Sequence, residues 1–281
     1  MPVITTKKEL QRHLSSSPNR ASLGLVPTMG ALHPGHAALV RQAVAENETV
    51  VVSIFVNPTQ FENNEDLDKY PDTFEKDILL LEEITKDVVV FAPTADEIYE
   101  HRVQSKTYDF EGLDKVMEGA FRDGHFNGVG TIVETLLHLV APDKAYFGEK
   151  DFQQLQIVRK LVAKKDIPVT IIGCPVVREA NGLAMSSRNG RLSEALRQEA
   201  SFIYKTLRAA KKKFGTKSAV NVMDWARKQF EGHPDLRLEY FVIADVETLT
   251  PIQKKKPEVK YRAFAAVYAD GVRLIDNIAL N

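Results

Sequence analysis

The sequence has very few cysteines and almost no net charge, and each of these features excludes a class of protein. Cys174 is the single cysteine among 281 residues, so neither an internal disulfide nor a metal site built from a cysteine cluster can form. We expect a buried thiol in a reducing compartment. Lysine and arginine number 37 against 38 aspartates and glutamates, and a net charge of −1 gives no overall attraction for nucleic acid or an anionic membrane. We therefore expect neither as a partner.

Long apolar runs are also missing. No window approaches ~18 consecutive apolar residues, the length that spans a membrane. The start of the chain, MPVITTKKELQRHL, lacks the uninterrupted apolar stretch of a secretion signal. We therefore expect a cytoplasmic protein. The composition, 44% hydrophobic and 27% charged, is that of an ordinary globular protein with a buried core.

Short runs rich in β-branched residues alternate with amphipathic helical segments through the first two thirds of the chain. The helix after the first run begins near Pro34, which suits a first helical turn because proline lacks an N–H. Such alternation is typical of an α/β fold with a Rossmann-like parallel sheet and helices on both faces. The expected strands are 22–26, 50–56, 88–91, 145–147 and 169–172.

The pattern changes after about residue 191. Two polar helices, 193–213 and 218–231, precede three alternating strands, and Asp270-Gly271 has the composition of a hairpin turn between the last two. We expect a first domain at 1–190 and a smaller C-terminal α+β domain at 191–281. The three strands are expected at 236–244, 261–268 and 272–277.

The first strand-to-helix connection, PTMGALHPGH at 27–36, has the features of a phosphate site. Backbone N–H groups and the dipole at a helix start favour an anion. His33 and His36 lie three residues apart and can both donate hydrogen bonds to phosphate oxygens, while Gly30 and Gly35 permit close backbone approach. A helix cap and a zinc site are the alternatives, and for zinc no third ligand is evident.

Three further segments carry polar groups at strand ends or in a loop. VSIFVNPTQF at 52–61 and YFGEKDFQQ at 146–154 each end a strand and supply Gln60 and Gln154. The third, MSSR at 185–188 after NGLA, resembles the mobile phosphate-binding loop of the nucleotidylyltransferase superfamily, in which hydroxyls and a cation hold the triphosphate. A helix N-cap with a nearby ion pair is the alternative for MSSR.

In their order and separation across residues 20–190, these motifs resemble the pantothenate synthetase (pantoate–β-alanine ligase) family of the nucleotidylyltransferase superfamily. The resemblance implies a proton-donating His36 assisted by His33, phosphate charge countered by Lys150 and Arg188, and pantoate held by Gln60 and Gln154. It also gives Gln60 to β-alanine and implies a homodimer. The implied ATP contacts are Met29, Gly30, Ala31, Leu32, His33, Pro34, Gly35, His36, Gly148, Glu149, Lys150, Asp151, Val177, Met185, Ser186, Ser187 and Arg188.

The reaction implied by the resemblance is ATP-dependent. The pantoate carboxylate attacks the α-phosphorus of ATP·Mg²⁺, and the β-alanine amine then attacks the resulting acyl adenylate. Primary amides fit the pantoate role because they both donate to and accept from hydroxyls. We expect Mg²⁺ to bind mainly through phosphate oxygens and water, with no protein metal site. Asp77 is a candidate outer ligand, but a solvated helix residue is the favoured interpretation.

Two rival functions stay open at this point. A nucleotidylyltransferase acting on a phosphorylated small molecule would keep the histidine and MSSR motifs, yet should carry cations where Gln60 and Gln154 stand. A nonenzymatic nucleotide-sensing or RNA-binding module should have a basic face or an aromatic platform. The chain also departs from the family pattern at Asp72, at Asp123 and over residues 131–138.

Overall fold

The computed structural model describes residues 1–16, 21–61, 67–100 and 102–281, and the chain divides into two compact units. The first comprises Met1–Asp114, Glu118–Glu149 and Gln154–Pro175. The second comprises Lys115–Met117, Lys150–Gln153 and Val176–Asn281. These units are defined by their internal contacts, and the expected domain boundary between residues 190 and 191 stays a prediction.

The first unit is built on a six-stranded sheet in the order β1-β4-β3-β2-β5-β6, and every pair of neighbours is parallel. The Rossmann-like parallel sheet expected from the sequence is therefore confirmed. β2 lies between β3 and β5, so the carboxyl ends of these three strands share one edge of the sheet. The strands are β1 Val3–Ile4, β2 Leu23–Thr28, β3 Thr49–Ile54, β4 Val89–Phe91, β5 Lys144–Gly148 and β6 Thr170–Cys174.

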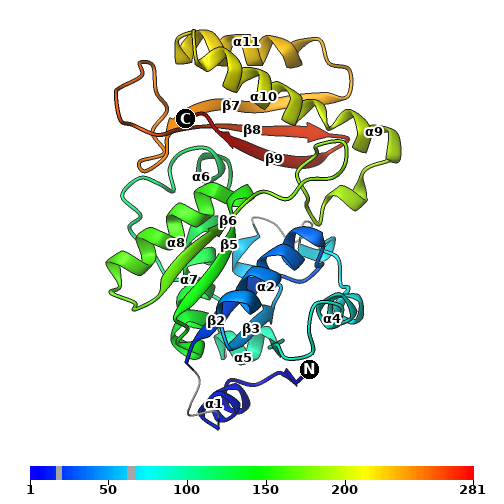
Figure 1. Cartoon of the computed structure of the whole chain (residues 1–281), viewed down its shortest axis with the longest axis vertical. Coiled ribbons are helices and arrows are strands. Elements are labelled where there is room, and N and C mark those ends of the chain that lie inside the picture. Colours follow the sequence, from blue (N-terminus) through cyan, green and yellow to red (C-terminus); the bar gives the residue numbers. More distant parts are fainter. Residues whose placement is uncertain (17–20, 62–66, 101) are drawn as a thin grey trace. The chain divides into compact units, whose positions relative to one another are not determined.

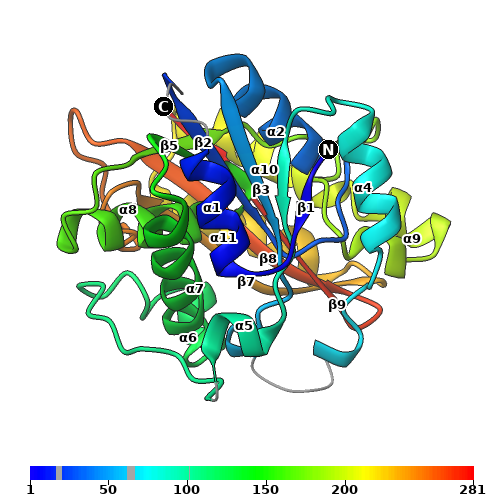
Figure 2. The ribbon, with the colours of Figure 1, turned by 90° about the horizontal axis from the view of Figure 1, so that it is seen from below.

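Helices cover both faces of this sheet (Figures 1 and 2). α2 (Pro34–Glu46) and α4 (Phe74–Glu82) lie on one face. α7 (His125–Val140) and α8 (Phe152–Lys164) lie on the other, where α1 (Lys7–Ser15) packs against α7. Right-handed crossovers between parallel strands produce this division, because the chain reverses its direction of travel along the sheet after β4. The shorter helices are α5 Ala95–Tyr99, α6 Glu118–Phe121, η1 Pro58–Gln60 and η2 Glu149–Asp151.

The central strands have continuous apolar sequences because both of their faces are buried. Val26, Val50 and Val52 pack against Leu39 and Val40 of α2, and all five side chains are at least nine-tenths buried. Each such side chain contributes roughly 1.5–3 kcal/mol relative to an exposed one. This packing fixes the start of α2 beside the carboxyl end of β2.

The second unit contains an antiparallel sheet of β7 (Leu236–Asp245), β8 (Tyr261–Ala269) and β9 (Val272–Ala279). α10 (Phe202–Phe214) and α11 (Ala219–Glu231) pack against this sheet, which confirms the expected small α+β arrangement. Asp270 and Gly271 form the two-residue turn between β8 and β9, with φ of 47° and 72°. Positive φ at both positions matches the type I′ hairpin that Asp-Gly predicts.

The single helix expected over 193–213 is wrong in one respect. α9 (Glu194–Glu199) ends before α10 begins at Phe202. The N–H groups of Ser201 and Ile203 each bond to the carbonyl three residues earlier, which tightens the chain between the two helices. The apolar pattern continues across this junction, so the sequence signal alone does not reveal the break.

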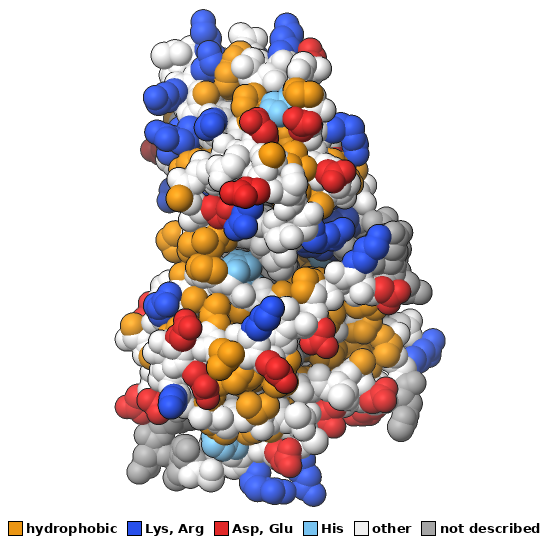
Figure 3. All heavy atoms as spheres, turned by 90° about the vertical axis from the view of Figure 1, so that its right-hand side faces the viewer, with side chains coloured by type: hydrophobic (Ala, Val, Ile, Leu, Met, Phe, Trp, Pro, Cys, Tyr) orange, Lys and Arg blue, Asp and Glu red, His pale blue; other side chains and the backbone are white. Residues whose placement is uncertain are grey.

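On the face drawn in Figure 3, basic and acidic side chains are interspersed among apolar ones. Across the part of the chain that the structure describes, no helix is long and apolar enough to cross a membrane.

The backbone at the start of α7 lies so close to η1 that the contact position has no room for a side chain. A Cβ built on Gly128 would lie 2.1 Å from the carbonyl oxygen of Thr59. The Gly128 carbonyl in turn accepts a hydrogen bond of 3.2 Å from the Asn57 side chain. Glycine at position 128 is therefore what lets α7 support the turn that carries Gln60.

Replacing Gly128 with alanine should lower the free energy of unfolding by about 1–3 kcal/mol, because backbone must shift to accept the methyl group. Urea unfolding followed by circular dichroism measures this change. Gly232→Ala is the matched control, since a Cβ there meets open space. Equal stability of the two variants would contradict the close approach.

Candidate functional site

The predicted segments of the first unit converge because their strands are neighbours. Segment 27–36 includes the end of β2, while Gln60 follows β3 and Gly148 ends β5. Open α/β sheets bind ligands at the carboxyl ends of their strands. The parallel register, with Thr28 opposite Ile54, brings the first two segments out of the sheet at the same level.

The two histidines predicted to bind phosphate form a pair at the start of α2. Their ring centroids lie 4.1 Å apart with an interplanar angle of 34°. His33 is the N-cap, and its Nδ1 accepts a hydrogen bond of 3.1 Å from the Gly35 N–H. An accepting Nδ1 leaves the proton of a neutral ring on Nε2, so His33 can donate through that atom. Both rings are partly exposed.

The turn before this helix is held in a conformation that few residues adopt. Gly30 has φ of 76° and Ala31 has φ of 49°, both in the left-handed region. The Thr28 hydroxyl accepts a hydrogen bond of 3.2 Å from the Gly30 N–H and donates one of 2.7 Å to the Ser53 carbonyl. The end of β3 thus fixes the beginning of the loop.

Asp77 of α4 fixes the other end of the loop. Its Oδ1 accepts 2.8 Å and 3.0 Å hydrogen bonds from the Leu32 N–H and the Thr73 hydroxyl. The side chain is only 2% exposed, so the sequence interpretation of a solvated helix residue is wrong. Burial raises the pKa of this carboxyl, and the hydrogen bonds from Leu32, Thr73 and Ala31 oppose that shift. Its role in the structure is to hold the loop.

Gln60, predicted to hold pantoate, ends η1 and is 8% exposed. Its carbonyl accepts hydrogen bonds from His125 Nδ1 at 2.8 Å and from Arg122 Nη2 at 3.3 Å. Its N–H bonds to the carbonyl of Asn57 at 3.2 Å. The backbone of this residue is therefore fixed by its own turn and by two side chains more than 60 positions away in the sequence.

Sequence reasoning did not single out Asn57, which is fully buried. Its Nδ2 donates to Gly128, and its Oδ1 accepts from the hydroxyls of Thr59 and Tyr99. The sequence did offer a signal for a structural role of Asn57, because its amide follows a buried strand and precedes a proline. His125 and Arg122 gave no such signal, because their contact with residue 60 depends on the tertiary fold.

Gln154, the second predicted pantoate residue, lies near the start of α8 and is half-buried. Its neighbour Gln153 is 4% exposed and donates a hydrogen bond of 2.7 Å to the Val116 carbonyl. The buried amide at 153 is thus structural, whereas the amide at 154 has solvent access. Gly148 and Glu149 are also partly exposed in the first unit.

The second unit carries the remaining predicted ATP residues. Val177 and Met185 are joined by a hydrogen bond of 3.0 Å from the Met185 N–H to the Val177 carbonyl, which closes a short hairpin. The chain then turns through 186–188, where the Ser186 side chain accepts from the Arg188 N–H at 3.2 Å. Asn189 is buried and ties this turn to Glu179 and Ala184 with hydrogen bonds of 2.7 Å and 3.1 Å.

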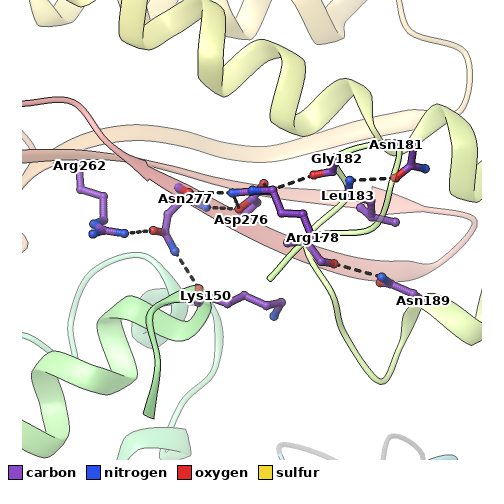
Figure 4. A network of polar contacts seen from close by, with 10 residues as sticks. Lys150, Arg178, Asn181, Gly182, Leu183, Asn189, Arg262, Asp276 and Asn277 are labelled. Atoms are coloured by element: carbon purple, nitrogen blue, oxygen red, sulfur yellow. Dashed lines mark hydrogen bonds and ion pairs between the residues drawn. The ribbon is translucent and has the colours of Figure 1, made fainter. Parts of the chain in front are cut away.

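Lys150, also in the second unit, lies in η2 with 18% of its side chain exposed. Its Nζ is 3.7 Å from the Asp151 carboxylate. Figure 4 shows Lys150 with the polar residues of β9 and the hairpin. The predicted ATP residues thus come from both units, 29–36, 148 and 149 from the first and 150, 151, 177 and 185–188 from the second. Their assignment to ATP stays a prediction.

Known proteins similar to this chain point to one family. The family model described as pantoate-beta-alanine ligase matches residues 2–279. The pantothenate synthetase of Christiangramia forsetii is 59% identical over 260 residues, covering 92% of each chain. That of Bacteroides thetaiotaomicron is 46% identical over 279 residues, which cover 99% of this chain and 98% of the relative.

Solved structures agree with the sequence relatives. Pantothenate synthetase from Thermus thermophilus superposes with a TM-score of 0.92 at 40% identity, covering 100% of this chain and 99% of the other. A pantoate-beta-alanine ligase from Francisella tularensis, in complex with beta-gamma ATP and beta-alanine, has a TM-score of 0.83 at 34% identity. It covers 100% of this chain and 98% of its own. The chain described here therefore belongs to the pantoate–β-alanine ligase family.

Proposed function

We propose that this ligase joins pantoate to β-alanine in two steps that share one acyl adenylate. In the first, the pantoate carboxylate attacks the α-phosphorus of ATP and pyrophosphate leaves. In the second, the β-alanine amine attacks the activated carbonyl, the amide of pantothenate forms and AMP leaves. Positioning and charge neutralisation dominate such phosphoryl chemistry, with little covalent role for the protein.

The paired imidazoles at the start of α2 carry this proposal. Their rings lie 4.1 Å apart, with His33 as the N-cap of α2 and His36 in its first turn, shortly after the buried strand β2. His36 is proposed as the proton donor to the phosphates, with His33 donating from Nε2. Donors fixed before the reaction stabilise charge that develops in the transition state.

Recognition of pantoate is assigned to the amides of Gln60 and Gln154. Neutral amides pair with the hydroxyls of the acid while its carboxylate stays free to attack. Gln60 is also proposed to contact the β-alanine amine. A nucleotidylyltransferase acting on a phosphorylated substrate would need cations at these positions, so the amides favour the ligase.

Lys150 and Arg188 are proposed to counter the charge of the phosphates. The backbone at 29–36 and residues 148–151, 177 and 185–188 complete the proposed ATP contacts. The structure of the Francisella tularensis relative, in complex with beta-gamma ATP and beta-alanine, supports ATP and β-alanine as ligands. Within the described residues, no group of three or more His, Cys, Asp or Glu side chains could hold a metal. Mg²⁺ is proposed to enter with ATP, bound mainly by phosphate oxygens and water, as is usual for this ion with nucleotides.

A homodimer in the cytoplasm is proposed for the working enzyme. Cys174 is buried, and burial raises the pKa of its thiol to about 11, which suits an inert thiol in a reducing compartment.

Sedimentation equilibrium of the purified protein tests the oligomeric state. A single species at the mass of one chain would contradict the dimer.

Replacing His36 with alanine should lower turnover by ~10²–10³-fold, the loss expected for one transition-state donor. Steady-state pyrophosphate release at saturating substrates measures it, with circular dichroism to verify folding. His138→Ala is the matched control, because that histidine is exposed on α7. Turnover near that of the control would remove His36 from the mechanism.

Alanine at Gln60 or Gln154 should weaken pantoate binding about 5- to 150-fold, since an unpaired buried hydroxyl costs ~1–3 kcal/mol. ATP binding should change less than two-fold, roughly the scatter of a surface substitution. Calorimetric titration with each ligand separates the two effects, and Gln229→Ala on the exposed face of α11 is the control. Equal losses for both ligands would place these amides outside the acid pocket.

The adenylate should form without β-alanine. Enzyme in excess is mixed with labelled pantoate and ATP·Mg²⁺, quenched rapidly and analysed for pantoyl adenylate and one equivalent of pyrophosphate. Added β-alanine should then convert the intermediate to pantothenate and AMP. Pyrophosphate that appears only with β-alanine, or ADP and phosphate as products, would contradict the two-step mechanism.

A further inference from the structure

Two adjacent residues of β9 are linked to the two proposed phosphate-binding segments of the second unit. Asn277 bonds directly to the backbone of Lys150, and Asp276 acts through Arg178 on the hairpin that precedes residues 185–188. Asp276 is 5% exposed and Asn277 is 2% exposed. Neither belongs to a segment that the sequence motifs singled out. Burying a carboxylate and an amide is unfavourable unless their polar atoms are paired, so the partners of these groups indicate what the two residues do.

Asp276 binds Arg178 through two hydrogen bonds. Nη1 lies 2.6 Å from one carboxylate oxygen and Nη2 lies 2.9 Å from the other. The fork geometry of this pair fixes both the position and the plane of the guanidinium. The same Nη1 donates to the Gly182 carbonyl at 3.1 Å. Asp276 thereby orients a cation that bonds to the hairpin preceding residues 185–188.

A face of the guanidinium is also held in place. Arg178 Cζ lies 3.6 Å from the centroid of the Tyr204 ring, a cation–π stack. Gly182 is packed against the same ring, because a Cβ built on it would lie 2.9 Å from Tyr204 Cδ1. Arg178 also pairs with Ala184 across the hairpin in an antiparallel bridge. The hairpin is therefore fixed by contacts to Asp276 and Tyr204.

Asn277 reaches the second segment. Its Nδ2 donates a hydrogen bond of 2.8 Å to the carbonyl of Lys150, and its Oδ1 accepts from Arg262 (Figure 4). The Arg262 guanidinium is held in turn over the Phe152 ring, at 4.0 Å. The amide can neither rotate nor flip without losing a bond at each end. The main chain at Lys150 is therefore fixed to the same strand as the hairpin.

We propose that Asp276 and Asn277 are positioning residues that set the proposed phosphate-binding groups, Lys150 and residues 185–188, in fixed positions relative to each other. Within this unit, each segment is joined to β9 by a separate hydrogen-bonded path. Both Lys150 and the turn that carries Arg188 are therefore supported by the same strand, β9. This inference rests on the proposed function, which assigns both segments to the phosphates of ATP.

A purely structural role would predict loss of stability and nothing else. Buried ion pairs contribute little net stability compared with apolar substitutes, which makes a role in orientation the better account. The same sheet offers a matched control. Arg273 and Glu239 form a partly buried ion pair, with Arg273 Nε 2.9 Å from the carboxylate. This pair belongs to neither of the two hydrogen-bonded paths that join Lys150 and the hairpin to β9.

The test compares Asp276→Asn and Asn277→Ala with the control Glu239→Gln. We expect kcat for pyrophosphate release to fall ~10- to 100-fold in the first two, because small misplacements of charge-neutralising groups cost this much. KM for ATP should rise, while KM for pantoate should change less than two-fold. Glu239→Gln should lower the midpoint of thermal unfolding but retain kcat within two-fold. All assays are run well below the lowest midpoint.

Tyr204→Leu provides a variant that is less prone to misfolding, since that side chain is only partly buried. It should alter the same parameters in the same direction by a smaller factor. If Asp276→Asn and Tyr204→Leu match the control in kcat and in KM for ATP, the proposal is overturned. Equal rises in KM for pantoate and ATP would also overturn it.

Arg188→Met separates this inference from the function on which it rests. If Arg188→Met weakens ATP but the β9 variants do not, the assignment of the phosphates stands and the positioning role fails. If Arg188→Met leaves ATP binding unchanged, the phosphate assignment itself is wrong.

Discussion

The parallel pairing of β2 with β3 and β5 is the constraint on which the first unit depends. It places three strand ends at one edge of the sheet, and each end carries a segment with candidate ligand-binding groups. Valines buried on both faces of the central strands hold this arrangement, and the helix after β2 starts where its backbone N–H groups face the same edge. The proposed phosphate site therefore depends first on the pairing of these strands.

Buried polar side chains then fix the backbone of segments that have little regular structure. Asp77 fixes the loop before α2, Asn57 fixes η1, and Asn189 fixes the turn after Met185. Each of the three is nearly inaccessible to solvent. The unfavourable burial of these groups is offset by their hydrogen bonds, and the result is a defined backbone where strands and helices cannot supply one.

The second unit uses the same principle through ionic groups. Two ion pairs, Arg178 with Asp276 and Glu179 with Arg197, attach the hairpin to strand β9 and helix α9. Residues 182–191, which end the hairpin and form the turn after it, are rich in Gly, Ser and Asn and would sample many conformations without such contacts.

The sequence by itself determined the class of fold, the positions of the main strands and the family. β-branched runs, helical apolar spacing and the Asp270-Gly271 turn are local signals, and the confirmed sheets match them. The paired histidines were recognisable because both lie within four residues on one turn. Only the tertiary structure decided the surroundings of Asp77, the support of Gln60 by His125, and the contacts of Asp276 and Asn277. The contacts of Asp77 with Leu32, of His125 with Gln60 and of Asn277 with Lys150 join residues 45, 65 and 127 positions apart. Such separations leave no periodic trace in a single sequence.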